Sequence, residues 1–376
     1  MKILIVTEYY WPHIGGVEIV FKNLAEGLIK RGHEVKVVTA QVPDTKAQEN
    51  LNGVEIHRVK VPKFAARYFF TLLSFQKIWT QARDVDLIHT TLYNAALPAW
   101  FVAKFRRKKA VLSVHEVYGK RWTERFKISY VWATFHRILE RVILMLKFPA
   151  YVCVSQATMD DFEPYKPYKS ITKVIHNGID NELFNPQKYD VKKEREKLNL
   201  KDFTYLFYGR PGISKGLEYL LRAVPEIHQN IPQSQGLFIV SKDPKKGYKQ
   251  AQKIIRKLKI EDKIKLIKPV PYHELPRYLK AVDCVVIPSL AEGFGFTAAE
   301  SCAMETPVVV SETASLPEVA SGKVVFVPPK DSKAIAQGVI KIHKKEFQKI
   351  PKKNFSWDKN VEEHLKIYKE LCPQNH

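Results

Sequence analysis

Two cations lie in a glycine-bounded segment, which reads GRPGISKG at residues 209–216. Gly209 lets the backbone pass close to a ligand. Arg210 presents a planar fork to phosphate oxygens, and Lys215 adds a compact second charge near the start of the next helix. Two fixed cations suit a diphosphate whose negative charge grows as it leaves. The alternative is that both are solvated surface charges in a chain with 61 Lys and Arg residues.

The segment EGFGFTAAE at residues 292–300 is a second candidate site. It follows an apolar run and leads into a helix that we expect to begin near Thr297, so backbone N–H groups at the helix start would face an anion. Glu292 in the loop and Glu300 about one turn into the helix would accept hydrogen bonds from two sets of hydroxyls, one on a sugar and one on a ribose. As alternatives, Glu292 is a surface charge and Glu300 a partner of the helix dipole. The candidate ligand-binding set is Glu292, Gly293, Phe294, Gly295, Phe296, Thr297 and Glu300.

The first half of the chain offers a glycine pair and two histidines. Gly15 and Gly16 precede a helix, where backbone N–H groups and the helix dipole would face a phosphate, although a tight turn explains them equally well. His115 ends an apolar run with Tyr118 behind it, and His89 ends the run before that. Two such histidines facing one crevice favour a substrate role for His115, whereas for His89 a substrate role is the alternative to that of a satisfied polar residue.

These residues must be positioned by alternating strands and helices. Short β-branched runs alternate with amphipathic stretches such as 17–31, which is typical of βαβ units and parallel sheets. The pattern restarts after residue 200, so we predict an α/β chain of two doubly wound halves with ligands beyond the carboxyl ends of the strands. The expected strands are 2–6, 34–39, 87–90, 110–115, 151–155, 204–208, 236–240, 264–267, 284–287, 308–310 and 324–327.

A strand ends in the turn sequence HNGID at residues 176–180, which marks a linker and includes Asn177. A length of 376 residues also favours two domains. We therefore predict a first domain at 1–178, a second at 179–355, and a terminal helix within 356–376 that crosses back to the first domain.

Composition excludes several classes of protein. Four cysteines without a CxxC pair indicate a reducing compartment and no zinc site, and no run of 18 residues is free of charge, so we expect a cytoplasmic protein without a membrane span. Asp84 and Asp86 have the spacing of a metal-binding pair but precede a strand, so we interpret them as capping residues and expect no required metal. The net charge of +22 favours polyanionic partners: nucleic acid, anionic lipid or a phosphorylated substrate.

Taken together, these segments resemble the retaining GT-B glycosyltransferases of family 4, also called group 1 glycosyltransferases. The resemblance covers essentially the whole chain and implies two Rossmann-like domains with an inter-domain cleft, the first binding the acceptor and the second the nucleotide-sugar donor. It rests on Gly15-Gly16, His115, residues 177–180, the segments 209–216 and 292–300, the LPEV sequence at 316–319 and the terminal helix.

The resemblance also implies roles for individual residues. Arg210 and Lys215 would hold the donor diphosphate, Glu300 the ribose hydroxyls, and Glu292 the hexose that is transferred. His115 would contact the sugar near the reacting centre. Gly15 and Gly16 would approach the donor phosphate or the acceptor, and the loop 270–276, which begins with Val270, would contact the base of a UDP- or GDP-sugar. Retention by front-face attack would require no enzymic nucleophile, metal or cofactor beyond the nucleotide-sugar co-substrate.

Three positions depart from the pattern of the family. The sequence SKDP at 241–244 replaces a Gly-Asp-Gly-type turn, Glu116 replaces an aspartate, and Ala314 and Ser315 replace glycines. The identities of the sugar and of the base therefore remain open at this stage.

The acceptor side mixes aromatic and cationic residues in the stretches 64–79 and 120–147, the latter including Arg121, Arg125, Phe126 and Lys127, with a basic run at 104–109. This composition suits an interfacial helix on an anionic membrane, so we expect a lipid or lipid-linked acceptor at the inner face of the cell membrane, with acceptor contacts from His89, Tyr118 and Asn177. The alternatives are a solvated basic surface with a soluble acceptor, and a nucleotide-sugar epimerase of the same fold. We expect no nucleic-acid partner because no recognition motif accompanies the charge.

Overall fold

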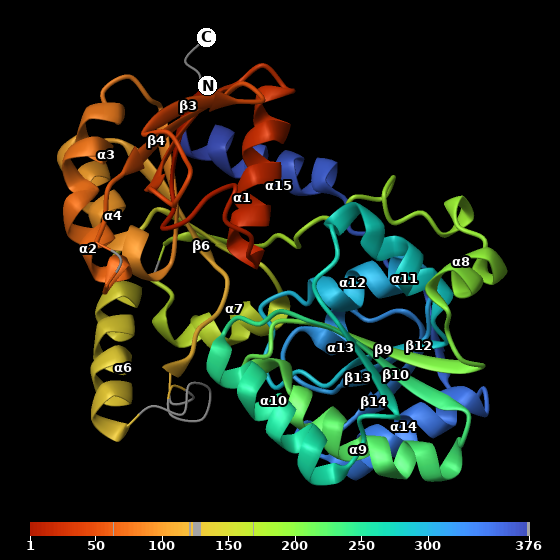
Figure 1. Ribbon diagram of the computed structural model, residues 1–376. Coiled ribbons are helices and arrows are strands. Elements are labelled where there is room, and N and C mark those ends of the chain that lie inside the picture. Colours follow the sequence, from red (N-terminus) through yellow and green to blue (C-terminus); the bar gives the residue numbers. More distant parts are fainter. Residues whose placement is uncertain (63, 120–121, 123–128, 168, 374–376) are drawn as a thin grey trace. The chain divides into compact units, whose positions relative to one another are not determined.

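Two mostly parallel sheets carry the chain, one in each of two units (Figure 1). The computed structural model describes residues 1–62, 64–119, 122, 129–167 and 169–373. Unit 1 consists of Met1–Gly178 with Ser356–His376, and unit 2 of Ile179–Phe355. The predicted α/β architecture of two doubly wound halves is confirmed.

Unit 1 holds a sheet in the order β3-β4-β2-β1-β5-β6-β7-β8, in which β3 pairs antiparallel and the other pairs are parallel. Helices cover both faces, which explains why β1 is apolar and buried from Ile3 to Val6. The strands are β1 (Lys2–Val6), β2 (Glu34–Ala40), β3 (Gln48–Leu51), β4 (Val54–Val59), β5 (Leu87–Thr91), β6 (Lys109–Val114), β7 (Ala150–Cys153) and β8 (Ile171–Val174). The helices are α1 (Gly16–Ile29), α2 (Ala66–Leu73), α3 (Phe75–Gln81), α4 (Ala96–Phe105), α6 (Tyr130–Leu144), α7 (Gln156–Phe162) and α15 (Trp357–Leu371).

Unit 2 holds a sheet in the order β11-β10-β9-β12-β13-β14-β15, with β15 antiparallel at one edge. The core on one face is formed with α9, α10 and α14. The strands are β9 (Phe203–Gly209), β10 (Ser234–Val240), β11 (Ile264–Ile267), β12 (Cys284–Ile287), β13 (Val308–Ser311), β14 (Gly322–Val327) and β15 (Gln348–Ile350). The helices are α8 (Val191–Leu198), α9 (Leu217–Asn230), α10 (Lys245–Leu258), α11 (Leu275–Ala281), α12 (Phe296–Ala303), α13 (Leu316–Val319) and α14 (Ser332–His343).

The strand order of each sheet reverses at one place. In unit 1 the chain leaves β1 toward β2 and β4, then resumes at β5 on the other side of β1. In unit 2, β10 and β12 flank β9 in the same way. Loops that follow neighbouring strands at such a reversal diverge and open a crevice at the carboxyl edge. The fold therefore predicts one ligand site per unit, beside β1 and β5 and beside β9 and β12.

The terminal helix α15 packs on unit 1 beside α1, as the amphipathic pattern of 357–371 predicts (Figure 1). Val361 and Tyr368 are buried in the core that α1 also covers. A Cβ atom at Gly27 of α1 would come within 2.5 Å of Val361, so glycine is what permits this close approach. Within the described part of the chain, no helix combines the length and the apolarity that are needed to cross a bilayer.

The sequence analysis missed three strands, β3, β4 and β15, at or near the edges of the sheets, and indicated a fourth, β8, only as the strand that ends in the turn sequence at 176–180. β3 and β4 form a hairpin around Asn52 and Gly53, whose φ angles are 53° and 87°. An Asn-Gly pair with two positive φ angles is the turn that two-residue hairpins favour, so the signal was present. The third, β15, is a short polar strand without a comparable signal.

Candidate functional site

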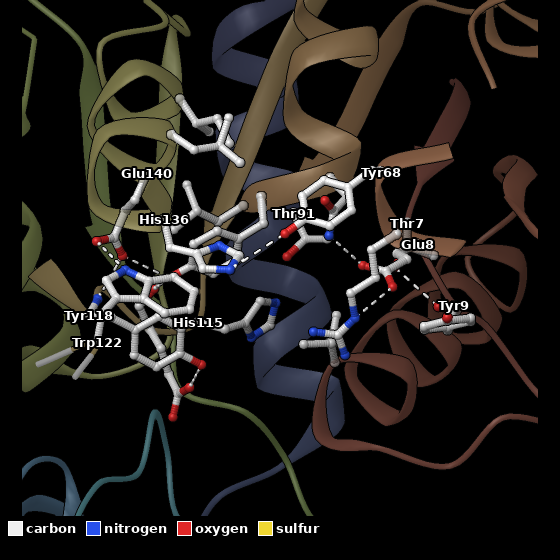
Figure 2. A pocket seen from close by; sticks show the side chains of 18 of the residues that line it. Thr7, Glu8, Tyr9, Tyr68, Thr91, His115, Tyr118, Trp122, His136 and Glu140 are labelled. Atoms are coloured by element: carbon white, nitrogen blue, oxygen red, sulfur yellow. Dashed lines mark hydrogen bonds and ion pairs between the residues drawn. The ribbon is translucent and has the colours of Figure 1, made fainter. Parts of the chain in front are cut away.

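Unit 1 contains a pocket of about 590 Å³ at its strand-order reversal (Figure 2). Its walls come from the residues after β1, the end of β5, the residues after β6, and helices α2 and α6. A pocket of this volume suits a small ligand. Of the predicted residues in unit 1, His115 and Tyr118 line it.

Glu140 of α6 organises one wall of the pocket. Its side chain is buried, and its two oxygens accept hydrogen bonds from the backbone N–H groups of Tyr118 and Gly119 at 2.7 Å, from the Tyr93 hydroxyl at 2.8 Å and from Trp122 Nε1 at 3.1 Å. Four donors compensate the burial of one carboxylate. Glu140 was not predicted as a site residue. The signal that could have indicated it is its place beside apolar residues of a helical stretch, because a carboxylate that is buried there needs hydrogen-bond partners.

Two aromatic pairs give the pocket flat apolar walls. The rings of Trp122 and His136 stack with centroids 4.6 Å apart and an interplanar angle of 12°, and those of Tyr93 and Tyr118 stack at 5.7 Å and 18°. Figure 2 shows His136 of α6 meeting Tyr118 and Trp122 of the segment after β6, and Tyr93 comes from the short helix Tyr93–Ala95 after β5. Such walls beside carboxylates suit a ligand with both apolar faces and hydroxyl groups. Arg121, Arg125, Phe126 and Lys127, which the sequence analysis also named, lie outside the described residues.

The opposite wall carries Glu8, which follows β1. Its carboxylate accepts a hydrogen bond from Asn94 Nδ2 at 2.7 Å and lies 3.2 Å from Arg67 Nε. Burial raises the pKa of Glu8, whereas Arg67 and Asn94 act in the opposite direction. The pocket therefore places a carboxylate and a guanidinium side by side.

His115 lies directly after β6 and its ring points into the pocket (Figure 2). Its Nε2 atom is shielded from solvent and makes no hydrogen bond among the described residues. Burial lowers the pKa of His115 to about 4, so the imidazole is neutral near pH 7. A neutral ring with an unoccupied nitrogen is suited to a hydrogen bond with a ligand hydroxyl.

Gly15 and Gly16 begin α1, with Gly15 as its extended N-cap. A Cβ atom at Gly15 would approach Glu18 Oε2 to 2.3 Å, because the Glu18 carboxylate lies over this helix start and bonds His13 Nδ1 at 2.8 Å. An acidic side chain thus occupies the place that the sequence analysis assigned to a phosphate. Neither glycine lines the pocket, but Glu18 does.

The structure places His89 and Asn177 outside the lining of the unit 1 pocket. His89 is fully buried within β5, with Nδ1 2.5 Å from the Tyr368 hydroxyl of α15 and Nε2 2.8 Å from Ser113 Oγ. Burial holds its pKa well below the usual range. Alternation along β5 directs His89 toward the face that α15 covers, away from the pocket. Asn177 is buried and also does not line the pocket.

In unit 2, the loops after β9 and β12 pack directly against each other. The backbone N–H of Leu290 donates to the carbonyl of Ser214 at 2.7 Å. Gly216 has φ 63°, and a Cβ atom there would lie 1.8 Å from the carbonyl oxygen of Pro288. Glycine is therefore required for this contact. Arg210 follows the end of β9 and is exposed.

Lys215 and Glu292 form an ion pair across these two loops. Lys215 Nζ lies 2.6 Å from Glu292 Oε1, which also accepts a hydrogen bond from Ser289 Oγ at 2.8 Å. The sequence analysis assigned the two residues to different parts of one ligand, and the structure brings them into contact at the carboxyl edge of the sheet. An incoming anion would compete with Glu292 for the ammonium group.

Glu300 lies buried in α12, and two tyrosine hydroxyls donate to it. Tyr208 donates to Oε2 at 2.8 Å and Tyr272 to Oε1 at 2.9 Å. Burial raises the pKa of Glu300 to about 7, while the two hydrogen bonds lower it. Neither tyrosine was predicted as a partner, although Tyr208 immediately precedes Gly209 and Tyr272 lies two residues beyond Val270. Val270 itself is partly buried in the loop before Tyr272.

The side chain of Ser315 binds two backbone carbonyl groups of the loop 292–296. The Ser315 hydroxyl lies 3.1 Å from the carbonyl oxygen of Glu292 and 2.8 Å from that of Phe294. Gly295 has φ 95° and caps α12, which begins at Phe296, one residue before the predicted start at Thr297. Gly293 lies in the loop between Glu292 and Phe294 and is partly buried. The departure from glycine at position 315 thus supplies a hydroxyl that fixes the loop.

Asp84 and Asp86 of unit 1 contact a lysine side chain and a backbone N–H group at the edge of the sheet opposite to the carboxyl ends of its strands. Asp84 lies 3.2 Å from Lys36 Nζ, and Asp86 accepts a hydrogen bond from the backbone N–H of Lys2 at 2.7 Å. In the described ranges of the chain, no group of three or more His, Cys, Asp or Glu side chains is placed to hold a metal ion.

Comparison with known proteins assigns both units to related families. Residues 14–183 match the family described as Glycosyltransferase Family 4, and residues 189–364 match Glycosyl transferases group 1. An uncharacterized glycosyltransferase of Methanocaldococcus jannaschii is 29% identical over 98% of both chains. A D-inositol 3-phosphate glycosyltransferase of Corynebacterium jeikeium is 26% identical, with 96% of this chain and 93% of the relative covered.

Solved structures show the same fold. Sucrose-phosphate synthase from Thermosynechococcus elongatus superimposes with a TM-score of 0.83 at 22% identity, covering 98% of both chains. Anabaena HepE in complex with UDP and glucose superimposes with a TM-score of 0.73 at 19% identity, covering 99% of this chain and 95% of its own. With a family match in each unit and a GT-B fold throughout, the chain belongs to the GT-B glycosyltransferases of the family 4 and group 1 type.

Proposed function

We propose that the protein transfers a hexose from a UDP- or GDP-sugar to an acceptor hydroxyl, with retention of the anomeric configuration and without a metal ion. The observation that carries the proposal is the cluster at the carboxyl edge of the unit 2 sheet, where Lys215 and Glu292 lie on two loops that pack together and Glu300 lies in helix α12, which follows the second loop. Cations for phosphates and carboxylates for hydroxyls are the groups that a nucleotide sugar requires.

On this proposal unit 2 binds the donor. The diphosphate attracts Lys215 away from Glu292 and is also held by Arg210, so that Glu292 becomes free to accept hydrogen bonds from the hexose. Glu300 accepts from the ribose hydroxyls, and the backbone around Val270 contacts the base. Support for a uridine nucleotide comes from Anabaena HepE, which was solved with UDP. Two cations on the diphosphate stabilise the charge that develops as it leaves.

Unit 1 binds the acceptor in its 590 Å³ pocket. The bond between the anomeric carbon and the diphosphate breaks while the acceptor oxygen bonds the same face of that carbon, and the acceptor proton passes to an oxygen of the departing phosphate. Neutral His115 is placed to hydrogen-bond a sugar hydroxyl, and Tyr118 supplies an aromatic wall. No protein nucleophile takes part, so the step needs no pair of closely spaced carboxylates.

The acceptor class that we propose is a lipid or lipid-linked saccharide reached at the cytoplasmic face of the membrane. A soluble sugar or polyol is the second candidate, which two similar proteins favour: one is a D-inositol 3-phosphate glycosyltransferase, and the other is a sucrose-phosphate synthase. The membrane candidate is favoured by the aromatic and basic surface of unit 1, because polar acceptors in water need no such surface.

The test combines nucleotide binding with turnover. UDP, GDP and ADP are added separately, and the nucleotide that binds raises the melting temperature of wild-type protein. Lys215→Ala abolishes that rise, whereas the matched control Lys344→Ala, an exposed lysine after α14, retains it. Turnover of the corresponding nucleotide sugar persists in excess EDTA, and NMR of the product shows the donor's anomeric configuration. No binding of any nucleotide refutes the proposal, and interconversion of the sugar without an acceptor identifies an epimerase instead.

A further inference from the structure

Helix α6 carries a stripe of exposed apolar side chains. Its members, Val131, Phe135, Ile138, Val142 and Met145, are 76%, 47%, 61%, 51% and 67% exposed. They follow one another at intervals of four and three residues, which places them along one side of the helix. A helix of a globular protein ordinarily buries such a stripe, so the face calls for an occupant.

Neighbouring residues add aromatic and apolar surface. Trp132 and Tyr130 at the start of α6 are 59% and 72% exposed. The rings of Trp132 and Phe135 pack edge to face with their centroids 5.9 Å apart. Helix α2 lies beside α6, since the ring of its Tyr68 stacks near that of His136 with centroids 6.4 Å apart, and α2 also exposes Leu72. Aromatic rings with a polar edge favour the boundary between water and hydrocarbon.

The charges around the stripe are cationic. Residues 130–147 contain Arg137, Arg141 and Lys147 but a single acidic residue, Glu140, whose carboxylate is bound by four donors inside the pocket. Arg141 is exposed and lies one turn from both Ile138 and Met145. This pattern complements an anionic lipid surface. Pairing with the same stripe of a second copy would bring like charges together.

The dimensions of α6 favour a position in the membrane surface. A helix of 15 residues is about 22 Å long, shorter than the hydrocarbon core of a bilayer. Its other side lines the pocket through His136, Leu139 and Glu140 (Figure 2). One face of α6 is therefore apolar and cationic, while the opposite face forms a wall of the binding site.

We propose that α6 docks the protein on an anionic lipid bilayer through this stripe. The helix lies parallel to the membrane with Phe135 and Ile138 below the headgroups and Arg141 among them. The pocket wall formed by the same helix is then held at the level of the headgroups, so that the polar part of a lipid acceptor enters the pocket. The last step rests on the proposed function; the docking itself does not.

The experiment measures co-sedimentation of the full chain with vesicles. Neutral phosphatidylcholine vesicles are compared with vesicles in which part of that lipid is replaced by anionic phosphatidylglycerol, at low and at physiological salt. Wild-type protein binds the anionic vesicles more tightly, and salt weakens the binding. The double variant Phe135→Ser, Ile138→Ser binds at least about ten-fold more weakly because its apolar insertion is lost. Arg141→Gln weakens binding about five-fold.

A matched control carries the same kind of change elsewhere. Val191→Ser with Leu266→Ser replaces two exposed apolar residues of unit 2 and leaves vesicle binding unchanged. Melting temperatures confirm that both double variants fold, which their exposure predicts. Nucleotide binding by unit 2 stays at the wild-type level in both, so a failure of the docking proposal is distinct from a failure of the proposed function.

Three results would overturn the docking proposal. The first is equal vesicle binding by the stripe variant and the wild type. The second is wild-type binding that does not depend on anionic lipid, or no binding to either kind of vesicle. The third is a wild-type dimer in analytical ultracentrifugation that the stripe variant converts to a monomer, which would assign the stripe to a second copy of the chain.

Discussion

Replacing Glu300 with glutamine removes a carboxyl group that titrates near neutral pH. The pKa of Glu300 is about 7 against an ordinary value of 4.5, chiefly because of burial. A folded-state pKa above the unfolded-state value means that folding favours the protonated form. The stabilising contribution of this group is therefore complete below about pH 4.5 and is lost as the pH rises through about 7.

The size of the effect follows from the two pKa values. Their difference corresponds to about 3 kcal/mol in the free energy of unfolding of unit 2, most of which disappears between about pH 5 and about pH 8. Glu300 is almost completely buried, so solvent screening reduces this figure little. The glutamine variant lacks this titration. The variant therefore loses less stability over that interval. A weaker hydrogen bond made by the amide lowers its stability equally at every pH, so it does not affect the comparison between pH values.

The tryptophans allow unit 2 to be followed separately. Far-UV circular dichroism reports unfolding of both units, whereas fluorescence reports unit 1 alone, so the difference between two urea titrations isolates unit 2. Glu346→Gln, which removes an exposed carboxylate of the same unit, is the control and keeps the wild-type pH dependence. If Glu300→Gln falls in stability as steeply as wild type, the buried carboxyl is not the titrating group. The six tryptophans, all in unit 1, are Trp11, Trp79, Trp100, Trp122, Trp132 and Trp357.

Three further substitutions test neighbouring parts of the two sites. Tyr272→Phe removes a hydroxyl that donates to Glu300, so the loss of stability in the same urea experiment moves to higher pH; a move to lower pH contradicts the assigned hydrogen bond. Gly216→Ala lowers the free energy of unfolding, measured by urea denaturation, by more than the roughly 1 kcal/mol that an alanine costs in a left-handed conformation, because its Cβ would lie 1.8 Å from a backbone carbonyl oxygen. The control Gly322→Ala has φ 76° and open space around its Cβ, so it lowers the free energy of unfolding by only that amount. Glu140→Gln exchanges an acceptor for a donor facing N–H groups and lowers unfolding free energy, followed by tryptophan fluorescence, by about 2 kcal/mol; an unchanged value would mean that the four bonds do not stabilise unit 1.

The parallel strands were predictable because helices cover both of their faces. A strand such as β12 is apolar at every position, and a run of this kind followed by a glycine-rich loop also predicts where ligands bind. The edge hairpin β3–β4 was not predicted because its first strand is polar and half exposed. The signal there is the turn at Asn52-Gly53 rather than the strands that it joins.

Only those parts of the candidate sites that lie on loops after strands could be predicted from the sequence. Lys215 and Glu292 follow adjacent strands, so topology alone brings them together. Glu140 and its donors belong to separate elements, and only packing determines their contact. His89 shows the limit of reasoning from a strand end, because its position in the strand did not reveal that it faces a helix from the far end of the chain.

The charge of the unit 1 pocket is opposite in sign to that of the whole chain. Its described lining residues include the carboxylates Glu8, Glu18, Glu116 and Glu140 but one guanidinium, that of Arg67, while the chain carries a net charge of +22. An acidic pocket favours a neutral or amino-bearing group over a phosphate. The surplus of positive charge therefore lies outside the pocket. The docking that we propose agrees with both observations: anionic lipids would meet the cations around α6, and an uncharged part of the acceptor would meet the carboxylates of the pocket.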